Sequence, residues 1–420
     1  MFETNLNKDI LQQNSLTTDV RRYVEYFKNM WMQSSTNIPQ LGEKYSKFEK
    51  IRREKQLTRF LNFLEKETRK NSSSEVELHE DSVIASAVKK LLIFAMDFNE
   101  NQIGILFSNK FLEVSRQFVK TARLFDPEIS VIDIFQACRN VWTMNWLQVM
   151  FGLPVELTPS VFAYSMLYPY TDNFLDESGI NEEDKISFSE RLSMRLSGEK
   201  VKPANSGEQK IYDLIGMIES QYDRLLNPYI YESLLAIHTA QSKSLCLLNP
   251  ELNLSDIELL DISIEKGGTS VLADGFLVAG ILSETQKLFT FGYGAFLQLV
   301  DDLQDVKQDF NNGIKTILTQ AVKKYPLDSY ANRTYNFGDE IVSSSEFFIK
   351  KDSDSILELM RKSDLLLMTE SIGLADEFYT RPYYKKIEKY SPFRFSYLIK
   401  QQEDYSYFNS LFKRLAGKYI

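Results

Sequence analysis

The sequence predicts an all-α protein folded around one large core. Glycine and proline are scarce, with 17 and 11 among 420 residues, so turn-forming positions are few and long helices are favoured over a many-stranded sheet. Apolar residues recur at three- and four-residue spacing through most of the chain, as they do along one face of a helix. Aromatic residues make up 13% of the chain and provide large apolar side chains for that core.

Polar or proline-containing stretches divide the helical pattern into segments. Helices are predicted over residues 21–33, 45–70, 81–96, 113–123, 131–151, 160–176, 209–248, 254–310, 353–370 and 376–390. Residues 177–205 are polar and end in a loop-rich stretch, residues 326–352 are predicted to be irregular and polar, and residues 311–313 to form a turn. Without an internal repeat, we expect one domain over residues 1–420, with residues 1–125 either part of it or an appended N-terminal helical layer.

Composition and charge exclude several classes of protein. Lys and Arg together number 49 against 58 for Asp and Glu, a formal net charge of −9, so no nucleic-acid interface is expected. The apolar runs are shorter than the roughly 20 residues that span a bilayer, and the N-terminal sequence has no secretory signal pattern, which favours a cytoplasmic protein without a transmembrane segment. Cys138 and Cys246 lie in apolar helical contexts and are expected to be buried reduced thiols.

A first acidic cluster follows a mostly apolar segment. Asp172 and Asp176 are four residues apart, which places both carboxylates on one helix face with Tyr168 and Ser165 preceding them. Two like charges at this spacing destabilise a helix mildly unless a cation compensates them. Magnesium suits this role because it prefers hard oxygen ligands. The alternative is an ordinary solvated acidic helix end.

A second acidic cluster is more specific. Asp301, Asp305 and Asp309 fall at i, i+4 and i+8, with Asp302 adjacent, and each four-residue step advances about 40° around a helix. Continued backward, this face reaches Gln298, Gly294 and Phe291, where the segment is apolar on nearly all sides. An all-apolar helix is buried, so we expect the aspartates to open into an internal cavity. The alternative is an amphipathic surface helix, whose apolar stripe would comprise Leu299, Leu303, Val306 and Phe310.

The two clusters together resemble the acidic motifs of the class I isoprenoid synthase superfamily, which includes trans-prenyltransferases, squalene and phytoene synthases and terpene synthases. Residues 172–176, DNFLD, are similar to its first aspartate-rich motif, with Asn173 where many members have Asp. Residues 292–305 are similar to the second motif of trans-prenyltransferases, and residues 301–309 have the spacing of the terpene-synthase motif. The resemblance implies a helical bundle around a central apolar cavity. It also implies that three magnesium ions bind there with diphosphate, on the catalytic residues Asp172, Asp176, Asp301 and Asp305 and on Asp309.

Two lysines add to the resemblance. Lys266, in IEKGGTS, is similar to a diphosphate-binding lysine of prenyltransferases, and the following Gly267 and Gly268 indicate a helix break near the cavity. Lys315, in NNGIKT, resembles the lysine of a second diphosphate-binding stretch. Each lysine taken singly could be an ordinary surface cation.

Further residues are candidates for the cavity wall or for binding diphosphate, on weaker grounds than the two motifs. Tyr168, Phe291, Gln298 and His238 are expected to line the cavity, although His238 could simply be a buried histidine in a packed helix. Arg139 lies in an apolar segment, where it would be either a diphosphate contact or a salt-bridged core arginine.

These features predict magnesium-dependent ionisation of a prenyl diphosphate, in which metals and lysines stabilise the leaving group and aromatic walls stabilise a carbocation. Chain elongation is not expected, because residues 1–125 contain no counterpart of the isopentenyl-binding Gly-Gly-Lys-Arg segment. Terpene cyclisation or prenyl–prenyl condensation fits better, in a monomer or a homodimer. The alternatives are a non-catalytic protein of the same fold that binds a lipid or a protein partner, and a plain helical scaffold.

Overall fold

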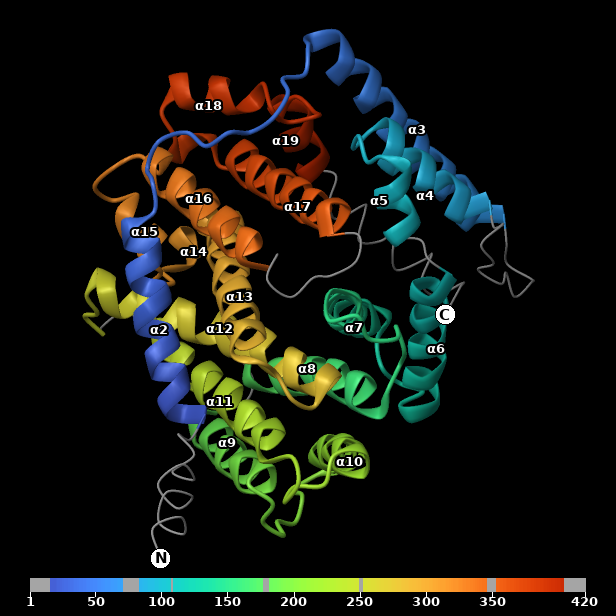
Figure 1. Cartoon of the computed structure of the whole chain (residues 1–420), viewed down its shortest axis with the longest axis vertical. Helices are drawn as coiled ribbons and strands as arrows, with labels where there is room; N and C mark the ends of the chain where they lie inside the picture. Colours follow the sequence, from blue (N-terminus) through green and yellow to red (C-terminus); the bar gives the residue numbers. More distant parts are fainter. Residues whose placement is uncertain are drawn as a thin grey trace, which may run out of the picture.

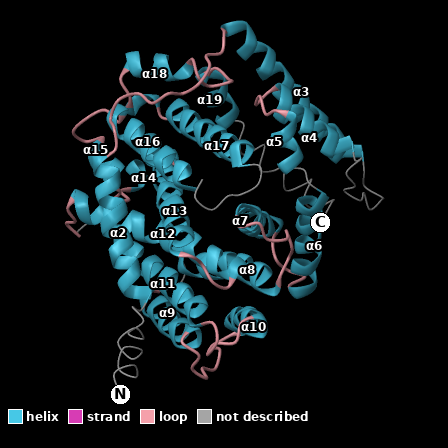
Figure 2. Cartoon of the chain, in the orientation of Figure 1, coloured by secondary structure: helices cyan, strands magenta, loops and turns pink. Residues whose placement is uncertain are grey.

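The computed structural model describes residues 16–70, 83–106, 109–176, 181–248, 252–345 and 353–403. Throughout these ranges the regular structure is helical and no strand is present (Figure 2), so the predicted all-α class is confirmed. In the described part of the chain, none of the helices combines the length and apolarity needed to cross a bilayer.

The helices follow one another with short connections (Figure 1). The first half comprises α2 (Leu16–Gln33), α3 (Lys47–Lys70), α4 (Val83–Phe94), α5 (Glu100–Leu106), α6 (Asn109–Phe125), α7 (Val131–Met150), α8 (Pro159–Asp176), α9 (Glu182–Leu196), α10 (Ser206–Gln221) and α11 (Pro228–Ser244). The second half comprises η1 (Leu245–Leu248), α12 (Asp256–Ala279), α13 (Glu284–Gln304), α14 (Val306–Asn312), α15 (Ile317–Ala321), α16 (Asp328–Ser344), α17 (Ser353–Leu374), η3 (Asp376–Phe378), α18 (Arg381–Glu388) and α19 (Phe395–Glu403).

Helices α12 and α13 form the centre of the molecule and share the most extensive contact of any described helix pair (Figure 1). Both begin with a capping box, in which Ser255 and Ser283 each bond reciprocally with the residue three positions later. Such a box satisfies backbone N–H groups that have no partner within the helix. Between the helices the chain reverses at Gly280, whose φ of +73° is readily adopted only by glycine.

Two glycines bring the backbones of α12 and α13 into direct contact. A Cβ atom added at Gly294 would lie 2.1 Å from the carbonyl oxygen of Gly267, and one added at Gly267 would lie 2.3 Å from that of Gly294. Gly268 is equally confined, since its Cβ would lie 2.4 Å from the ring of Phe291. The expected helix break at Gly267 and Gly268 is therefore wrong: α12 continues through both residues, and the missing side chains allow close packing instead.

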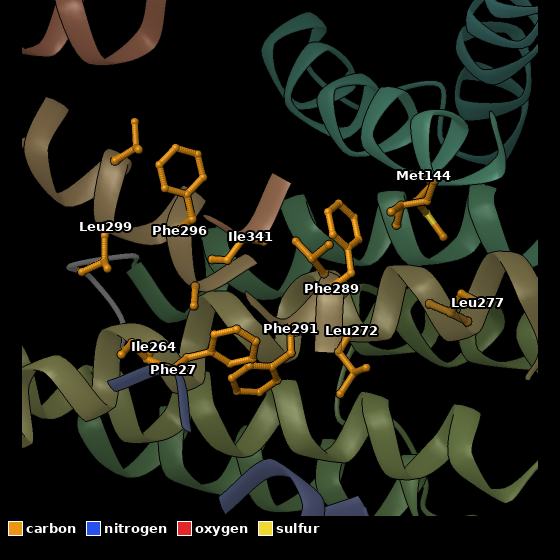
Figure 3. Close-up of a cluster of buried hydrophobic side chains, with 14 of the residues drawn as sticks. Phe27, Met144, Ile264, Leu272, Leu277, Phe289, Phe291, Phe296, Leu299 and Ile341 are labelled. Atoms are coloured by element: carbon orange, nitrogen blue, oxygen red, sulfur yellow. The ribbon is translucent and has the colours of Figure 1, made fainter. Parts of the chain in front are cut away.

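The core beside this pair is rich in aromatic rings (Figure 3). Phe27 of α2 stacks on Phe291 of α13 with ring centroids 5.8 Å apart, and it also contacts the edge of Phe337 from α16. Helix α11 packs along α12, while α8 packs against both α7 and α10. The amphipathic helices thus bury their apolar faces on a shared centre.

The N-terminal residues contribute to three separate parts of the fold. Helix α2 lies against α11, α12, α13 and α16, and α6 lies against α7. Helix α3 instead meets the C-terminal helices, where Arg394 forms an ion pair of 2.6 Å with the buried Glu54. In Figure 1, α3, α4 and α5 accordingly lie beside α17 and α19.

Some element boundaries differ from the prediction. The segment 177–205 contains α9, which buries Phe188, Leu192 and Leu196, and the segment 326–352 contains α16, which buries Phe337 and Ile341. Both helices were missed because a short apolar stripe among polar residues stabilises a helix only through tertiary packing. The predicted helix 254–310 is divided at Gly280 and again at Asp305.

The two cysteines form no disulfide. Cys138 is buried, and burial raises the pKa of its thiol to about 12, so this thiol stays protonated as expected for a core residue. Cys246 is only half-buried.

Candidate functional site

A cavity of about 260 Å³ lies between helices α7, α8, α9, α11, α12 and α13. We call it the six-helix cavity. Its two exposed lining residues are Tyr168 and Asp301, so the cavity opens to solvent beside them. The residues that line it are Asn140, Tyr164, Leu167, Tyr168, Thr171, Leu192, Leu196, Leu234, Ile237, His238, Gln241, Lys266, Ser270, Gln298 and Asp301.

The apolar and aromatic walls of the cavity are regular helix faces. On α8 the lining residues recur at i, i+3, i+4 and i+7, as do those of α11, and α9 adds two leucines four residues apart. Residues at these intervals share one side of a helix. The α8 face comprises Tyr164, Leu167, Tyr168 and Thr171, and the α11 face comprises Leu234, Ile237, His238 and Gln241.

The polar wall comes from α12 and α13. Lys266 and Ser270 lie one turn apart on α12, and Gln298 and Asp301 lie three residues apart on α13. The close approach of the two backbones at Gly267 and Gly294 brings these polar side chains to one side of the cavity. Lys266 acts electrostatically on Asp301.

Asp302 differs from its neighbour Asp301 in that it is buried and fully hydrogen-bonded. It accepts a 2.8 Å bond from the Ser263 hydroxyl and a 2.9 Å bond from the Gln298 amide. Burial raises the pKa of Asp302 to about 6, while these two bonds act in the opposite direction. Asp302 thus joins α12 to α13 and orients the Gln298 side chain that lines the cavity.

Asp301, Asp305 and Asp309 form a row of carboxylates that runs from the last turn of α13 into α14. Asp305 is the residue between α13 and α14, yet the backbone bonds continue, with 2.9 Å from Asp305 N to Asp301 O and 2.8 Å from Asp309 N to Asp305 O. Burial is the main cause of a raised pKa in all three groups. Repulsion by Asp301 adds to it at Asp305, and repulsion by Asp305 and Asp301 adds to it at Asp309, whose pKa reaches about 6.

Two cations face these carboxylates. Lys266 lowers the pKa of Asp301, Asp302 and Asp309, and Arg139 of α7 lowers that of Asp301 and Asp305, in each case against the larger effect of burial. Arg139 is exposed, so it is not a core arginine. Across the described ranges, no ion pair joins either cation to a carboxylate.

The structure brings together five of the residues predicted from the sequence, since Tyr168, His238, Lys266, Gln298 and Asp301 all line the six-helix cavity. Asp305 and Asp309 follow Asp301 along the chain and interact with it electrostatically.

The remaining predicted residues lie elsewhere or are not described. Phe291 is fully buried in the aromatic core against Phe27 (Figure 3) and is not one of the residues that line the cavity. Lys315 donates from its ammonium group to the Leu252 carbonyl, in the connection that precedes α12. Helix α8 extends through Asp172 and Asp176, but the side chains of both aspartates lie outside the described residues.

The residues present fit a hard divalent cation in part. In the described part of the chain no protein cation is bonded to the carboxylates of Asp301, Asp305 and Asp309, whose oxygens are the ligands that a hard divalent cation prefers. Repulsion from neighbouring carboxylates raises the pKa of Asp305 and Asp309, and a bound cation would relieve it. Within the described ranges, His, Cys, Asp and Glu side chains do not assemble into a metal-ready group of three or more.

Sequence reasoning missed several cavity residues. Asn140, Ser270 and the leucines of α9 are not part of either acidic motif. Leu192 and Leu196 carry a detectable signal, because their four-residue spacing is helical although the surrounding segment is polar. Nothing in the sequence identifies Asn140, whose place depends on the crossing of α7 with α8 and α12.

Comparison with known proteins adds no further identification: no protein-family model matches the chain, and no curated protein matches it.

Proposed function

We propose that the chain is a class I isoprenoid synthase-like enzyme that ionises a prenyl diphosphate in the six-helix cavity. One observation carries the proposal. A row of carboxylates, Asp301, Asp305 and Asp309, begins at the opening of a cavity whose other walls are mainly leucine, isoleucine and tyrosine, and the cations Lys266 and Arg139 act on the same row. This arrangement is complementary to an amphiphile, whose anionic head would bind beside the cations and a metal, and whose hydrocarbon tail would contact the apolar walls.

Magnesium would be held by Asp301, Asp305 and Asp309, together with Asp172 and Asp176 as the sequence predicts. When bound, magnesium supplies Lewis-acid stabilisation of the negative charge that grows on a departing diphosphate.

Lys266 and Arg139 would stabilise the same negative charge on the departing diphosphate. Within the described residues, Lys266 and Arg139 form no ion pair with a carboxylate, so both are available to bind phosphate oxygens. Charge-assisted hydrogen bonds to an anion are roughly twice as strong as neutral ones, so these residues favour the state in which diphosphate carries the most charge. Lys315 stays a prediction as a diphosphate ligand.

The walls hold the hydrocarbon part and exclude water. Leu192, Leu196 and Leu234 are almost completely buried and provide no group that could add to a carbocation. Tyr164 and Tyr168 present aromatic rings, and a ring face stabilises a nearby cation by about 0.5–2 kcal/mol. Loss of diphosphate would therefore give an allylic cation that either cyclises or reacts with a second prenyl chain.

Magnesium-dependent release of diphosphate tests this proposal. Geranyl, farnesyl and geranylgeranyl diphosphate are incubated with the full chain, with and without magnesium, and released diphosphate is measured. We expect release with at least one substrate and a loss of at least about 100-fold in Asp301→Asn, as for removal of a group that stabilises transition-state charge. Asp354→Asn, an exposed position on α17, is the matched control.

The outcomes separate the enzyme from its alternatives. Binding of a prenyl diphosphate without release would favour a non-catalytic lipid-binding protein of the same shape. Neither release nor calorimetric binding of magnesium and diphosphate would leave a plain helical scaffold, and the proposal would be rejected.

A further inference from the structure

His238 is a buried histidine for which, among the described residues, one ring nitrogen has hydrogen-bond partners and the other has none. Its Nε2 lies 3.0 Å from the backbone oxygen of Ser189 and 3.2 Å from the Ser189 hydroxyl. A carbonyl oxygen only accepts hydrogen bonds, so Nε2 must carry the proton in the neutral ring. Nδ1 is then the unprotonated nitrogen with a free lone pair.

The second nitrogen is not satisfied elsewhere in the described chain. Both hydrogen bonds of the ring belong to Nε2. Among the described residues Nδ1 has no hydrogen-bond partner, and it is not one of the fully buried polar atoms without a partner, so it is accessible from a space next to the ring. Since the ring is one of the cavity walls, Nδ1 is neither bonded to protein nor enclosed by it. It therefore faces the space of the six-helix cavity.

The surroundings of His238 favour the neutral ring. Only 8% of the residue is exposed, and burial lowers the pKa of the imidazole, with the Ser189 carbonyl acting weakly in the opposite direction. No charged group among the described residues contributes to this shift. The other lining residues on its face of α11 are Leu234, Ile237 and Gln241, and α9 adds Leu192 and Leu196, so most of the wall around the ring is apolar and Gln241 is its polar member.

A base in an apolar wall suits the last step of the proposed reaction. Departure of diphosphate leaves an allylic cation, and a cation can end as an alkene only if a neighbouring carbon loses a proton. The carboxylates beside the opening are required for the diphosphate, whereas Nδ1 lies among the residues that would surround the hydrocarbon. The lone pair of Nδ1 can accept that proton, whereas a histidine with only a structural role would not need an unbonded nitrogen on the cavity side.

We propose that His238 is the catalytic base that ends the reaction, an inference that rests on the proposed function. The C–H bond next to the cationic carbon breaks and its electron pair forms the C=C bond of the product. The proton goes to Nδ1 and gives an imidazolium, which returns it to the departing diphosphate or to water when the product leaves. The Ser189 carbonyl fixes the tautomer and stabilises the imidazolium, which still donates from Nε2.

Product analysis of His238→Gln tests this role. Glutamine can keep a buried N–H donor for the Ser189 carbonyl, but its amide oxygen is a far weaker base than imidazole. The alkene fraction is measured per diphosphate released, so that a change in the rate of ionisation does not enter the comparison. Loss of a general base typically changes the step it serves by about 10²–10⁴-fold, so we expect the alkene fraction to fall at least tenfold, with water-derived alcohols increasing.

Ser242→Ala is the matched control. Its hydroxyl bonds the Ser189 hydroxyl at 3.1 Å, so this variant disturbs the same hydrogen-bonded cluster without removing the base, and the wild-type products are expected. Unchanged alkenes in His238→Gln would overturn the role of His238 and leave the proposed function intact. Absence of diphosphate release in the wild type would instead reject the proposed function, and the base with it.

Nuclear magnetic resonance of the ring nitrogens provides a second measurement that does not require a folded variant at position 238. The chain has two histidines, so His79→Gln assigns the signals. We expect a neutral ring with the proton on Nε2 at neutral pH. A proton on Nδ1 would overturn the proposal, because that nitrogen could not then accept one.

Discussion

At the scale of the residue, Asp301 and Asp302 show how adjacent identical side chains acquire different roles. Asp302 is turned into the contact between α12 and α13 and bonded to Ser263 and Gln298, whereas Asp301 lines the cavity. A helix advances about 100° per residue, which is enough to separate a structural carboxylate from one available to a ligand. The sequence motif alone does not distinguish them.

The two lysines near the aspartates also have different places in the structure, although the sequence does not distinguish them. Lys266 and Lys315 flank the acidic row in the sequence and resemble diphosphate ligands equally well. Only Lys266 is brought to the cavity, while Lys315 donates to the Leu252 carbonyl. Distance along the chain could not separate them, because their placement depends on the packing of α12 and on the turn at Gly313.

A buried carboxyl group outside the cavity gives a prediction at this scale. Asp364 on α17 is 4% exposed and accepts a 3.4 Å hydrogen bond from the Tyr293 hydroxyl. Burial raises its pKa to about 8, against about 3.9 in an unfolded chain. Between these values the folded state holds a proton that the unfolded state has lost, so rising pH lowers the free energy of unfolding, by at most about 1.4 kcal/mol per pH unit.

Asp364→Asn should remove this dependence, because the amide resembles the protonated acid and can still accept from Tyr293. At pH 8.5 we expect the variant to be more stable than the wild type by about 2–5 kcal/mol, and near pH 4 to be equally stable. Urea unfolding at both pH values measures the difference. Asp354→Asn on the same helix should show none, and equal curves for Asp364→Asn and wild type would contradict an uncharged Asp364.

At the scale of the element, the contact of Gly267 with Gly294 determines the spacing of α12 and α13. In Gly294→Ala the new Cβ would lie 2.1 Å from a backbone oxygen, a contact that no side-chain rotation can relieve. We expect a loss of at least about 3 kcal/mol in the free energy of unfolding, at the upper end of what overpacking causes, measured by urea denaturation. The polar wall of the cavity should be displaced as well.

Gly216→Ala on α10 is the matched control for this substitution. A Cβ there meets nothing within 4 Å, and alanine replaces glycine favourably inside a helix by roughly 0.5–1 kcal/mol. The two variants should therefore differ in sign. Equal stability of Gly294→Ala and wild type would show that the two helices can separate without loss.

The helices themselves were largely predictable, and the exceptions have physical causes. Long periodic segments such as those of α2, α7 and α12 bury a continuous apolar face and were recognised. Helices α9 and α16 depend on packing against distant elements, which a local pattern does not contain. The double glycine suggested a helix break, because the sequence gives no sign that another backbone lies against it.

At the scale of the whole molecule, the cavity exists only because six helices between residues 131 and 304 enclose it. Periodicity predicted which face of α13 carries the aspartates, and this face extends to Gln298 as expected. It could not predict that the next residue on that face, Gly294, meets α12, or that Phe291 lies in the core. These depend on the crossing of helices, which is a property of the assembled fold.

Joint binding of magnesium and diphosphate should stabilise the whole molecule. Asp301, Asp305, Lys266 and Arg139 form no ion pair among the described residues, and we expect them to gain partners fully only when both ions are present, so that inorganic diphosphate with magnesium raises the Tm more than the sum of either alone. At a ligand concentration about 100 times the Kd the gain is about 2.7 kcal/mol, which differential scanning calorimetry detects, and chelation of magnesium should reverse it.

Asp301→Asn should lose most of the joint shift while Asp354→Asn keeps it. A shift with diphosphate alone that survives Asp301→Asn would show that the anion binds elsewhere, and that the carboxylate row does not serve as its metal-bearing partner.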